Sequence, residues 1–435
     1  MLTTDHSSVA VLGVPFHNVT MDETVAFIDD KIQLGGFHQI ATANVDFLMH
    51  AIRDPELQAI LCSCELVIPD GMPILWASKM MGVTLKERVC GVDLVPRVAE
   101  LCARRGYSMF LLGASEENSA RAAANLEERF PGLRIAGRYS PPVRPLDQMN
   151  HEEIVRRINQ ARPDVLLVAM GNPKQEKWLA MHRYELNVPV SIGVGGSIDF
   201  VAGAVSRAPK WMQNSGLEWA YRMSQEPKRL VQRYLGDAVG IARHLPSQLV
   251  TTMMQPRHKT QSGLFTDRAG NTLILSIYGD FTGEILSEFN ALSQEAMRSG
   301  LNLILNLSQT SYLGPDALGS LLTLASARRE YQHLWLAEMP AHLLRVLHAA
   351  RLGKLFMTTS SINDALYRTA KSEQNLFADM QRQTPNLPAP GPSRVQVRGE
   401  LLQNVCQNLT VESSMQSPAV PAGFSNEYDF RPQIG

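Results

Sequence analysis

Four short motifs carry side chains that could move a proton or hold an anion. Each follows an apolar run with the length of a buried strand. They are Thr42-Ala43-Asn44, Pro69-Asp70-Gly71, Gly171–Glu176 and the glycine-rich stretch Gly193–Asp199. In open α/β sheets, ligands bind outside the carboxyl ends of the strands. The motifs therefore predict one shared pocket at that edge of a sheet.

Asp70 is the carboxylate with the clearest chemical use. It follows the apolar run Leu66–Ile68 and precedes Gly71. A carboxylate in that place can be partly desolvated and can accept a proton from a hydroxyl. The same place also suits an aspartate that caps a helix near Met72–Met80. The sequence leaves both interpretations open.

The segment Gly171–Glu176 is typical of a turn that cradles a phosphate or an amide. Its glycine and proline fix its shape, and Lys174 and Gln175 offer donors near a helix N-terminus. A plain strand-to-helix turn is the alternative. The glycines of 193–196 lack the full G-x-G-x-x-G fingerprint and close the domain, which argues against a Rossmann oxidoreductase.

Apolar runs alternate with helical segments from Val9 to about Ile192. The predicted strands are Val9–Leu12, Gln39–Thr42, Leu66–Ile68, Ser108–Leu112, Val165–Met170 and Val188–Ile192. The predicted helices between them are Met21–Ile32, Asp93–Arg105, Ser119–Arg129 and His151–Asn159. Continuous apolar strands with helical crossovers predict an α/β domain with a Rossmann-like, mainly parallel sheet, over residues 8–206.

A basic helical segment over residues 207–257 follows this domain. It has eight basic and three acidic side chains in a chain whose net charge is −1. Arg222, Arg229 and Arg233 have the spacing of one helical face, and Pro227 predicts a break or kink. The face could bind an anionic ligand or an anionic membrane surface, or be only a solvated charge stripe. The near-neutral total argues against a nucleic-acid partner.

A second, smaller αβ pattern occupies residues 262–371, after a polar stretch, His258–Asp267, that reads as a linker. Its predicted strands are Thr272–Tyr278, Leu301–Leu307 and His333–Glu338, and its predicted helices are Pro315–Arg329, Ala341–Ala350 and Ile362–Arg368. Residues 372–435 are rich in Pro, Gly, Gln, Asn and Ser, which predicts a mostly disordered tail.

Several absences narrow the function classes. The five cysteines lack metal-ligand spacing, so no metal site is expected. No D-x-D pair occurs, so the charge of any nucleotide diphosphate would be met by cationic side chains and backbone donors. The first residues lack the pattern of a signal peptide, and no run approaches the roughly 18–20 apolar residues of a membrane span. These features predict a soluble, cytoplasmic protein.

As an ordered set, the motifs resemble the WecG/TagA/CpsF family of bacterial glycosyltransferases, over roughly residues 8–245. The other matching pieces are Arg88–Asp93, Phe110–Gly113, Arg207–Pro209, Gly216–Trp219 and Glu226–Arg229. The resemblance implies an inverting, metal-independent transfer from a UDP-sugar, often of the N-acetylmannosamine type. The implied acceptor is a polyprenyl-diphosphate-linked sugar at the inner face of the cytoplasmic membrane, in exopolysaccharide or cell-surface polysaccharide biosynthesis.

The resemblance also implies roles for single residues. Asp70 matches the catalytic base, and Thr42, Asn44 and Gln175 match catalytic residues around the donor and the catalytic pocket. Substrate binding is expected from Arg88, Gly113, Asn172, Pro173, Lys174, Gly195, Arg222, Arg229 and Arg233. The basic segment 207–257 matches an appendage that completes the site and faces the membrane, and no cofactor is expected.

The segment from about Gly270 to Ala370 resembles a STAS domain, the fold of anti-sigma-factor antagonists. Where that family reads D-S-S-G-L-G, residues 314–319 read G-P-D-A-L-G, so Asp316 occupies the phospho-acceptor place. Asp316 carries about one negative charge, against about 1.5 to 2 for phosphoserine.

Two interpretations of Asp316 follow. It could fix a state like the phosphorylated one, or it could be an early helix-turn acid in a module that docks a protein partner. For the whole chain, the alternative function is a non-enzymatic signalling protein that senses a nucleotide sugar and acts through the STAS domain.

Overall fold

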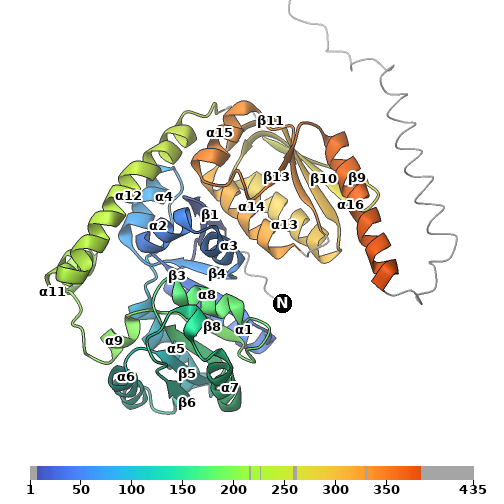
Figure 1. The fold of residues 1–435 in the computed structure, drawn as a ribbon. Coiled ribbons are helices and arrows are strands. Elements are labelled where there is room, and N and C mark those ends of the chain that lie inside the picture. Colours follow the sequence, from blue (N-terminus) through green and yellow to red (C-terminus); the bar gives the residue numbers. More distant parts are fainter. Residues whose placement is uncertain (1–6, 215–216, 226, 258–261, 329–331, 384–435) are drawn as a thin grey trace, which may run out of the picture. The chain divides into compact units, whose positions relative to one another are not determined.

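The computed structural model describes residues 7–214, 217–225, 227–257, 262–328 and 332–383. The chain up to Glu373 forms one compact unit (Figure 1). Its larger sheet has six strands, all paired in parallel, which confirms the predicted fold class. In spatial order they are β4 (Leu66–Pro69), β3 (His38–Ala43), β8 (Val190–Gly193), β7 (Val165–Ala169), β5 (Ser108–Gly113) and β6 (Arg134–Tyr139).

Both faces of this sheet are covered by helices. The helices are α1 (Met21–Leu34), α2 (Val45–Arg53), α3 (Pro55–Ser63), α4 (Met72–Met80), α5 (Gly91–Arg105), α6 (Glu116–Arg129), α7 (His151–Ala161), α8 (Lys174–Met181) and α9 (Ser197–Val201). Leu167 of β7 packs in the cluster that holds α1, α5 and α6, whereas its neighbour Leu166 packs with α7 and α8. Successive residues are therefore both buried, which is why these strands read as continuous apolar runs.

The first predicted strand does not join this sheet. β1 (Ser8–Val11) pairs antiparallel with β2 (Val14–His17), and the two form a separate hairpin. The N–H of Val67 in β4 donates to His17 Nδ1 at 2.9 Å, which attaches the hairpin to the main sheet.

The basic segment forms three helices, α10 (Lys210–Asn214), α11 (Glu218–Gln225) and α12 (Pro227–Met253). The break predicted at Pro227 is confirmed, because α11 ends before it and α12 begins at it. Arg222 and Arg233 therefore lie on different helices, and the single helical face expected for them does not form. No described helix is both long and apolar enough to cross a bilayer.

A second sheet of five strands follows, ordered β13-β12-β11-β10-β9. The strands are β9 (Gly263–Ala269), β10 (Thr272–Phe281), β11 (Asn302–Leu313), β12 (Leu334–Ala337) and β13 (Met357–Thr359). Only β9 is antiparallel to its neighbour. The helices are α13 (Glu284–Arg298), α14 (Pro315–Ala327), α15 (Ala341–Ala349) and α16 (Ile362–Gln383).

Two boundary predictions for this part differ from the structure. The expected linker His258–Asp267 runs into β9, an edge strand whose residues 265–268 are exposed and polar enough to read as a loop. The last predicted helix continues to Gln383, well into the expected tail. The rest of that tail, residues 384–435, lies outside the described residues.

The helix α14 is buried on two sides. One side packs on the second sheet, and the other meets the N-terminal hairpin and α3. Ala10 of the hairpin and Cys62 of α3 therefore belong to the same apolar cluster as the core of the second sheet. The Ser8 and Thr323 hydroxyls are hydrogen-bonded at 3.3 Å. A Cβ on Gly319 would lie 2.2 Å from the backbone oxygen of Ser8, so only glycine fits this contact without movement.

The substitution Gly319→Ala tests this contact. The added methyl should force α14 away from β1 and destabilise the fold by about 1–3 kcal/mol, the usual cost of overpacking. The expected measurement is a lower midpoint of thermal unfolding. Gly236→Ala is the matched control, because Gly236 is exposed in α12 with nothing within 4 Å of the new methyl. Both substitutions raise helix propensity, so equal behaviour of the two variants would contradict a tight contact at Gly319.

Candidate active site

The predicted motifs do meet at one edge of the larger sheet. Asp70 follows β4, Asn44 follows β3, Gly195 follows β8 and Gly171 follows β7. These four strands are consecutive neighbours in the sheet and run parallel. Gly113 is the last residue of the next strand, β5. The carboxyl edge therefore gathers the residues that the sequence analysis singled out.

Asp70 does not cap the helix that follows it. The N-cap of α4 is Gly71, which provides no side-chain cap. The Asp70 carboxylate instead turns toward the first turn of α5, where Gly91 N–H donates to its Oδ2 at 3.5 Å. The amide of Asp70 donates to Ala43 O at 2.8 Å, which holds the residue against β3. Of the two interpretations of Asp70, helix capping of α4 is excluded.

The protonation of Asp70 is tuned by its surroundings. Burial raises the pKa of Asp70 to about 6, although the cationic groups of Arg88 and Arg222 and the Gly91 bond act to lower it. The carboxylate of Glu218 opposes those cations and raises it further. A carboxylate with a pKa near neutrality is mostly ionised at pH 7 and is still basic enough to take a proton.

Thr42 and Asn44 are tied to the backbone around Asp70. The Thr42 hydroxyl is buried and donates to Gly193 O at 2.8 Å, which links β3 to β8. Asn44 is the N-cap of α2, where its Oδ1 accepts from the amides of Asp46 and Phe47. A Cβ on Gly91, the donor to Asp70, would lie 3.6 Å from Thr42 Oγ1. Thr42 and Asp70 are therefore brought together around Gly91.

Gln175 is buried and joins two loops of the edge. Its Oε1 accepts from the amides of Gly171 and Gly195, both at 3.2 Å, and its Nε2 donates to Glu176 Oε1 at 2.7 Å. Gln175, which was expected among the catalytic residues, thus fixes the ends of β7 and β8 relative to each other.

Glu176 ends the motif Gly171–Glu176, but the sequence assigns it no role at the site. It is 1% exposed, and its Oε2 has no hydrogen-bond partner in the described part of the chain. Burial raises the pKa of Glu176 to about 8, so the carboxyl is protonated at neutral pH. Gly193 leaves room for it, since a Cβ there would lie 2.6 Å from Glu176 Oε1. An acid in a strand-to-helix turn looks exposed in sequence, and only the packing reveals it.

The other residues of the 171–176 motif point in different directions. Asn172 Nδ2 donates to Asp46 Oδ2 at 3.1 Å, at the start of α2. Lys174 Nζ donates to Arg144 O at 2.6 Å, in the loop after β6. Pro173 is the N-cap residue of α8 and has no side-chain donor. The expected phosphate donor Lys174 is therefore engaged with backbone in this structure.

The arginines of the site differ in their partners, and two of them form ion pairs with the same glutamate. Arg88 and Arg207 both pair with Glu218 of α11, at 3.0 and 2.8 Å. Arg222 lies over the ring of Phe200 at 5.1 Å, and its Nε is buried without a hydrogen-bond partner among the described residues.

Arg233 lies beside α2 and not beside Asp70. Its Nε is 3.4 Å from Asp46 Oδ1. Asp46 therefore connects α12 with the loop of Asn172. The backbone of Arg229 lies in α12, but its side chain is outside the described part.

Asp316 has a local role at the start of α14. Its Oδ2 accepts from the Thr282 hydroxyl at 2.6 Å and from Gly283 N–H at 3.4 Å, and its Oδ1 accepts from Ala317 N–H at 3.0 Å. The carboxylate thus connects the turn before α13 with the first turn of α14, as an early helix-turn acid would.

Comparison with known proteins decides the family. The model of the glycosyl transferase WecG/TagA/CpsF family matches residues 9–255, more than half of the chain. The chain belongs to this family. It is a glycosyltransferase, and residues 264–359 match a model described as Mlab, STAS domain, so the glycosyltransferase is fused to a STAS domain.

Three relatives share one name, N-acetylglucosaminyldiphosphoundecaprenol N-acetyl-beta-D-mannosaminyltransferase. The Bacillus spizizenii W23 protein is 32% identical over 44% of this chain and 72% of its own length. The Bacillus subtilis 168 protein is 31% identical over 47% and 76%, and the Staphylococcus aureus MW2 protein is 30% identical over 52% and 87%. Among solved structures, an anti-sigma factor antagonist from Mycobacterium paratuberculosis aligns with 26% of the glycosyltransferase and 99% of itself, at 15% identity and a TM-score of 0.25.

The buried carboxyl of Glu176 gives the glycosyltransferase a pH-dependent stability. Its folded pKa of about 8 exceeds the ordinary value of 4.5, so the folded state binds more protons than the unfolded state between those pH values. The contribution of Glu176 to the free energy of unfolding therefore falls as the pH rises from 4.5 to 8. We expect Glu176→Gln, which stays neutral, to raise the unfolding midpoint relative to wild type more at pH 8.5 than at pH 5.

Glu128→Gln at an exposed position of α6 is the control. The difference between its unfolding midpoint and that of wild type should not change with pH. A Glu176→Gln difference that is equally flat across the pH range would contradict a protonated buried carboxyl.

Proposed function

We propose that the enzyme transfers a sugar of the N-acetylmannosamine type, or a related hexose, from a UDP-sugar to a polyprenyl-diphosphate-linked acceptor. The transfer is inverting and metal-independent and serves exopolysaccharide or cell-surface polysaccharide biosynthesis. The names of the relatives support this acceptor class and this sugar. The observation that carries the chemistry is Asp70, a half-buried carboxylate at the carboxyl edge with a pKa of about 6.

In this reaction Asp70 is the general base. The acceptor hydroxyl oxygen forms a bond to the anomeric carbon while the bond from that carbon to the diphosphate oxygen breaks. UDP leaves with the electron pair, and the hydroxyl proton passes to the Asp70 carboxylate. Gly91 N–H occupies Oδ2, and no described residue donates to Oδ1, so we assign the proton to Oδ1.

The departing UDP needs positive charge. Arg222 supports this role, because its Nε has no hydrogen-bond partner in the described part of the chain and its charge lowers the pKa of Asp70. Thr42, Asn44 and Gln175 hold the edge around the base. We assign the donor-binding surface to the remaining predicted residues, namely Arg88, Gly113, Asn172, Pro173, Lys174, Gly195, Arg229 and Arg233.

We also propose the division of the chain. Residues 8–206 form the sugar-transfer domain, 207–257 the appendage, 262–371 the STAS module and 372–435 a tail. The appendage, with its excess of five positive charges, places the enzyme peripherally on the inner face of the cytoplasmic membrane. The STAS module regulates the enzyme or docks a protein partner. Since α14 is covered by the hairpin, such a partner would use another face.

Asp70→Asn tests the base directly. UDP release by the purified full chain, with a panel of UDP-sugars and a lipid-diphosphate acceptor, should fall at least about a hundredfold, because a positioned base contributes roughly 10²–10⁴. Asp147→Asn, at an exposed position, should retain wild-type turnover. Equal rates for Asp70→Asn and wild type would refute the assignment. A wild-type protein that binds UDP-sugars but releases no UDP would favour the sensor alternative.

Arg222→Ala should move the pH dependence of the reaction. Loss of this cation removes an influence that lowers the pKa of Asp70, so the acid limb of kcat/KM should shift from about pH 6 to higher pH. Arg222→Lys keeps the charge, so the midpoint of the acid limb should return toward the wild-type value, even if this variant binds the donor more weakly. A midpoint that is identical in all three proteins would show that Arg222 does not act on the base.

A further inference from the structure

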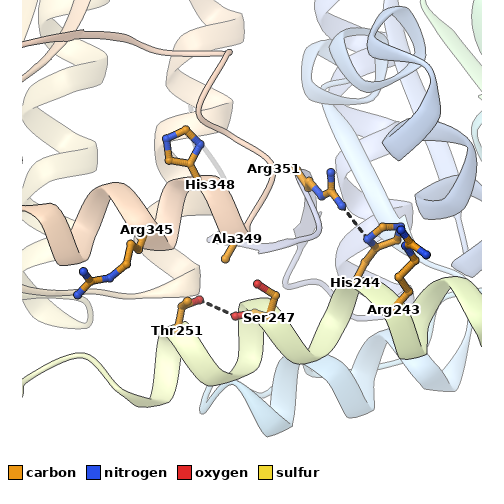
Figure 2. A pocket seen from close by; sticks show the side chains of 8 residues that line it. All are labelled: Arg243, His244, Ser247, Thr251, Arg345, His348, Ala349 and Arg351. Carbon is orange, nitrogen blue, oxygen red and sulfur yellow. Dashed lines mark hydrogen bonds between the residues drawn. The ribbon is translucent and has the colours of Figure 1, made fainter.

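A pocket of ≈ 420 Å³ lies between α12 and α15, apart from the carboxyl edge of the larger sheet (Figure 2). Its size falls in the range of small-ligand sites. We call it the junction pocket, because its walls come from the appendage helix and from the STAS domain. Its lining residues are Arg243, His244, Ser247, Thr251, Arg345, His348, Ala349 and Arg351.

The lining of the junction pocket is strongly cationic. It contains three arginines and two histidines, and none of its members is acidic. No ion pair involves Arg243, Arg345 or Arg351 in the described part of the chain. Arg243 and Arg351 lie beside His244 at one end of the pocket, whereas Arg345 lies at the other end (Figure 2). Two neighbouring guanidinium groups without a carboxylate repel each other, and a bound anion relieves that repulsion.

Among the described residues, the side chains of these arginines make one hydrogen bond, and its acceptor is a histidine. Arg351 donates to His244 Nδ1 at 2.7 Å, so the histidine is an acceptor there and Arg351 keeps its full charge (Figure 2). Burial, and after it three nearby cations, lower the pKa of His244: Arg351, Arg243 and Arg53. No carboxylate contributes to that shift, which agrees with a positive field in the pocket.

The polar groups of the wall complete the donor set. The Thr251 hydroxyl donates to Ser247 O at 2.8 Å and is committed to its own helix. The Ser247 side chain is exposed at the pocket and leaves its hydroxyl available. Arginine forks and hydroxyl groups match phosphate oxygens in geometry and in charge.

We propose that the junction pocket binds a phosphate-bearing anion, either a soluble phosphate compound or the headgroup of an anionic lipid. Its ligands are Arg243 from α12 and Arg351 from the STAS part, which lie beside His244, with Ser247 as a neutral donor. One anion then contacts the appendage and the STAS domain at once. This binding is separate from the sugar transfer proposed for the Asp70 edge.

The test uses the full chain and two probes. Inorganic diphosphate is titrated by calorimetry, and vesicles of phosphatidylcholine with and without phosphatidic acid are used for cosedimentation. The variant is Arg243→Gln with Arg351→Gln, two exposed positions. The control is Arg298→Gln with Arg104→Gln, which removes the same charge from exposed positions outside the pocket and outside the appendage. Thermal unfolding confirms that each protein is folded.

We expect the pocket variant to bind at least one probe at least about tenfold more weakly than wild type, because each arginine supplies a charge-assisted hydrogen bond. The control should bind both probes as wild type does, and Arg243→Lys with Arg351→Lys should recover part of the loss. A loss confined to diphosphate indicates a soluble ligand, and a loss of phosphatidic-acid vesicles indicates a lipid headgroup. Wild-type binding of both probes by the pocket variant, or no binding of either probe by wild type, overturns the proposal.

Discussion

Two buried amide side chains of the appendage segment hold much of the molecule in place. Gln248 of α12 is fully buried, where its Oε1 accepts from Leu12 N–H and its Nε2 donates to Ala10 O, both at 2.9 Å. Gln255, just past α12, accepts from Leu313 N–H at 2.8 Å and donates to Leu313 O at 3.2 Å. Each amide thus pairs with one backbone N–H and one backbone C=O, and buried backbone groups require such partners. Removing either would leave a buried donor and acceptor unpaired.

At the carboxyl edge of the larger sheet, polar side chains likewise provide hydrogen-bond partners for backbone groups. Gln175 satisfies the amides of two loops, Thr42 satisfies the carbonyl of Gly193, and Asn44 caps α2. These bonds keep the edge rigid without using Asp70, whose carboxylate accepts a single long bond, from Gly91, among the described residues. A rigid frame around a lightly bonded carboxylate is what positioned proton transfer needs.

Sequence predicted the parts of this fold that depend on local pattern. The strands around Leu111 and Leu167 were predicted because both faces are buried and the apolar run is continuous. The polar edge strands β6 and β9, with their exposed residues, give no such run and were missed. Asp70 was identified because it follows a strand, whereas Glu176 and Gln248 could not be, since their burial depends on elements distant in sequence. The separation of Arg222 from Arg233 followed from Pro227, but their different targets required the tertiary structure.

The contact between the first strand and α14 has a consequence for synthesis. Ser8 and Thr323 are 315 residues apart in the chain. At about 5–20 residues per second, a ribosome needs roughly 16–60 s to make the intervening segment. During that interval the outer face of the hairpin, with Ala10, lacks the partner that later covers it. The sugar-transfer part therefore acquires its complete surface only after the STAS helix has emerged, so its final folding step waits on nearly the whole described chain.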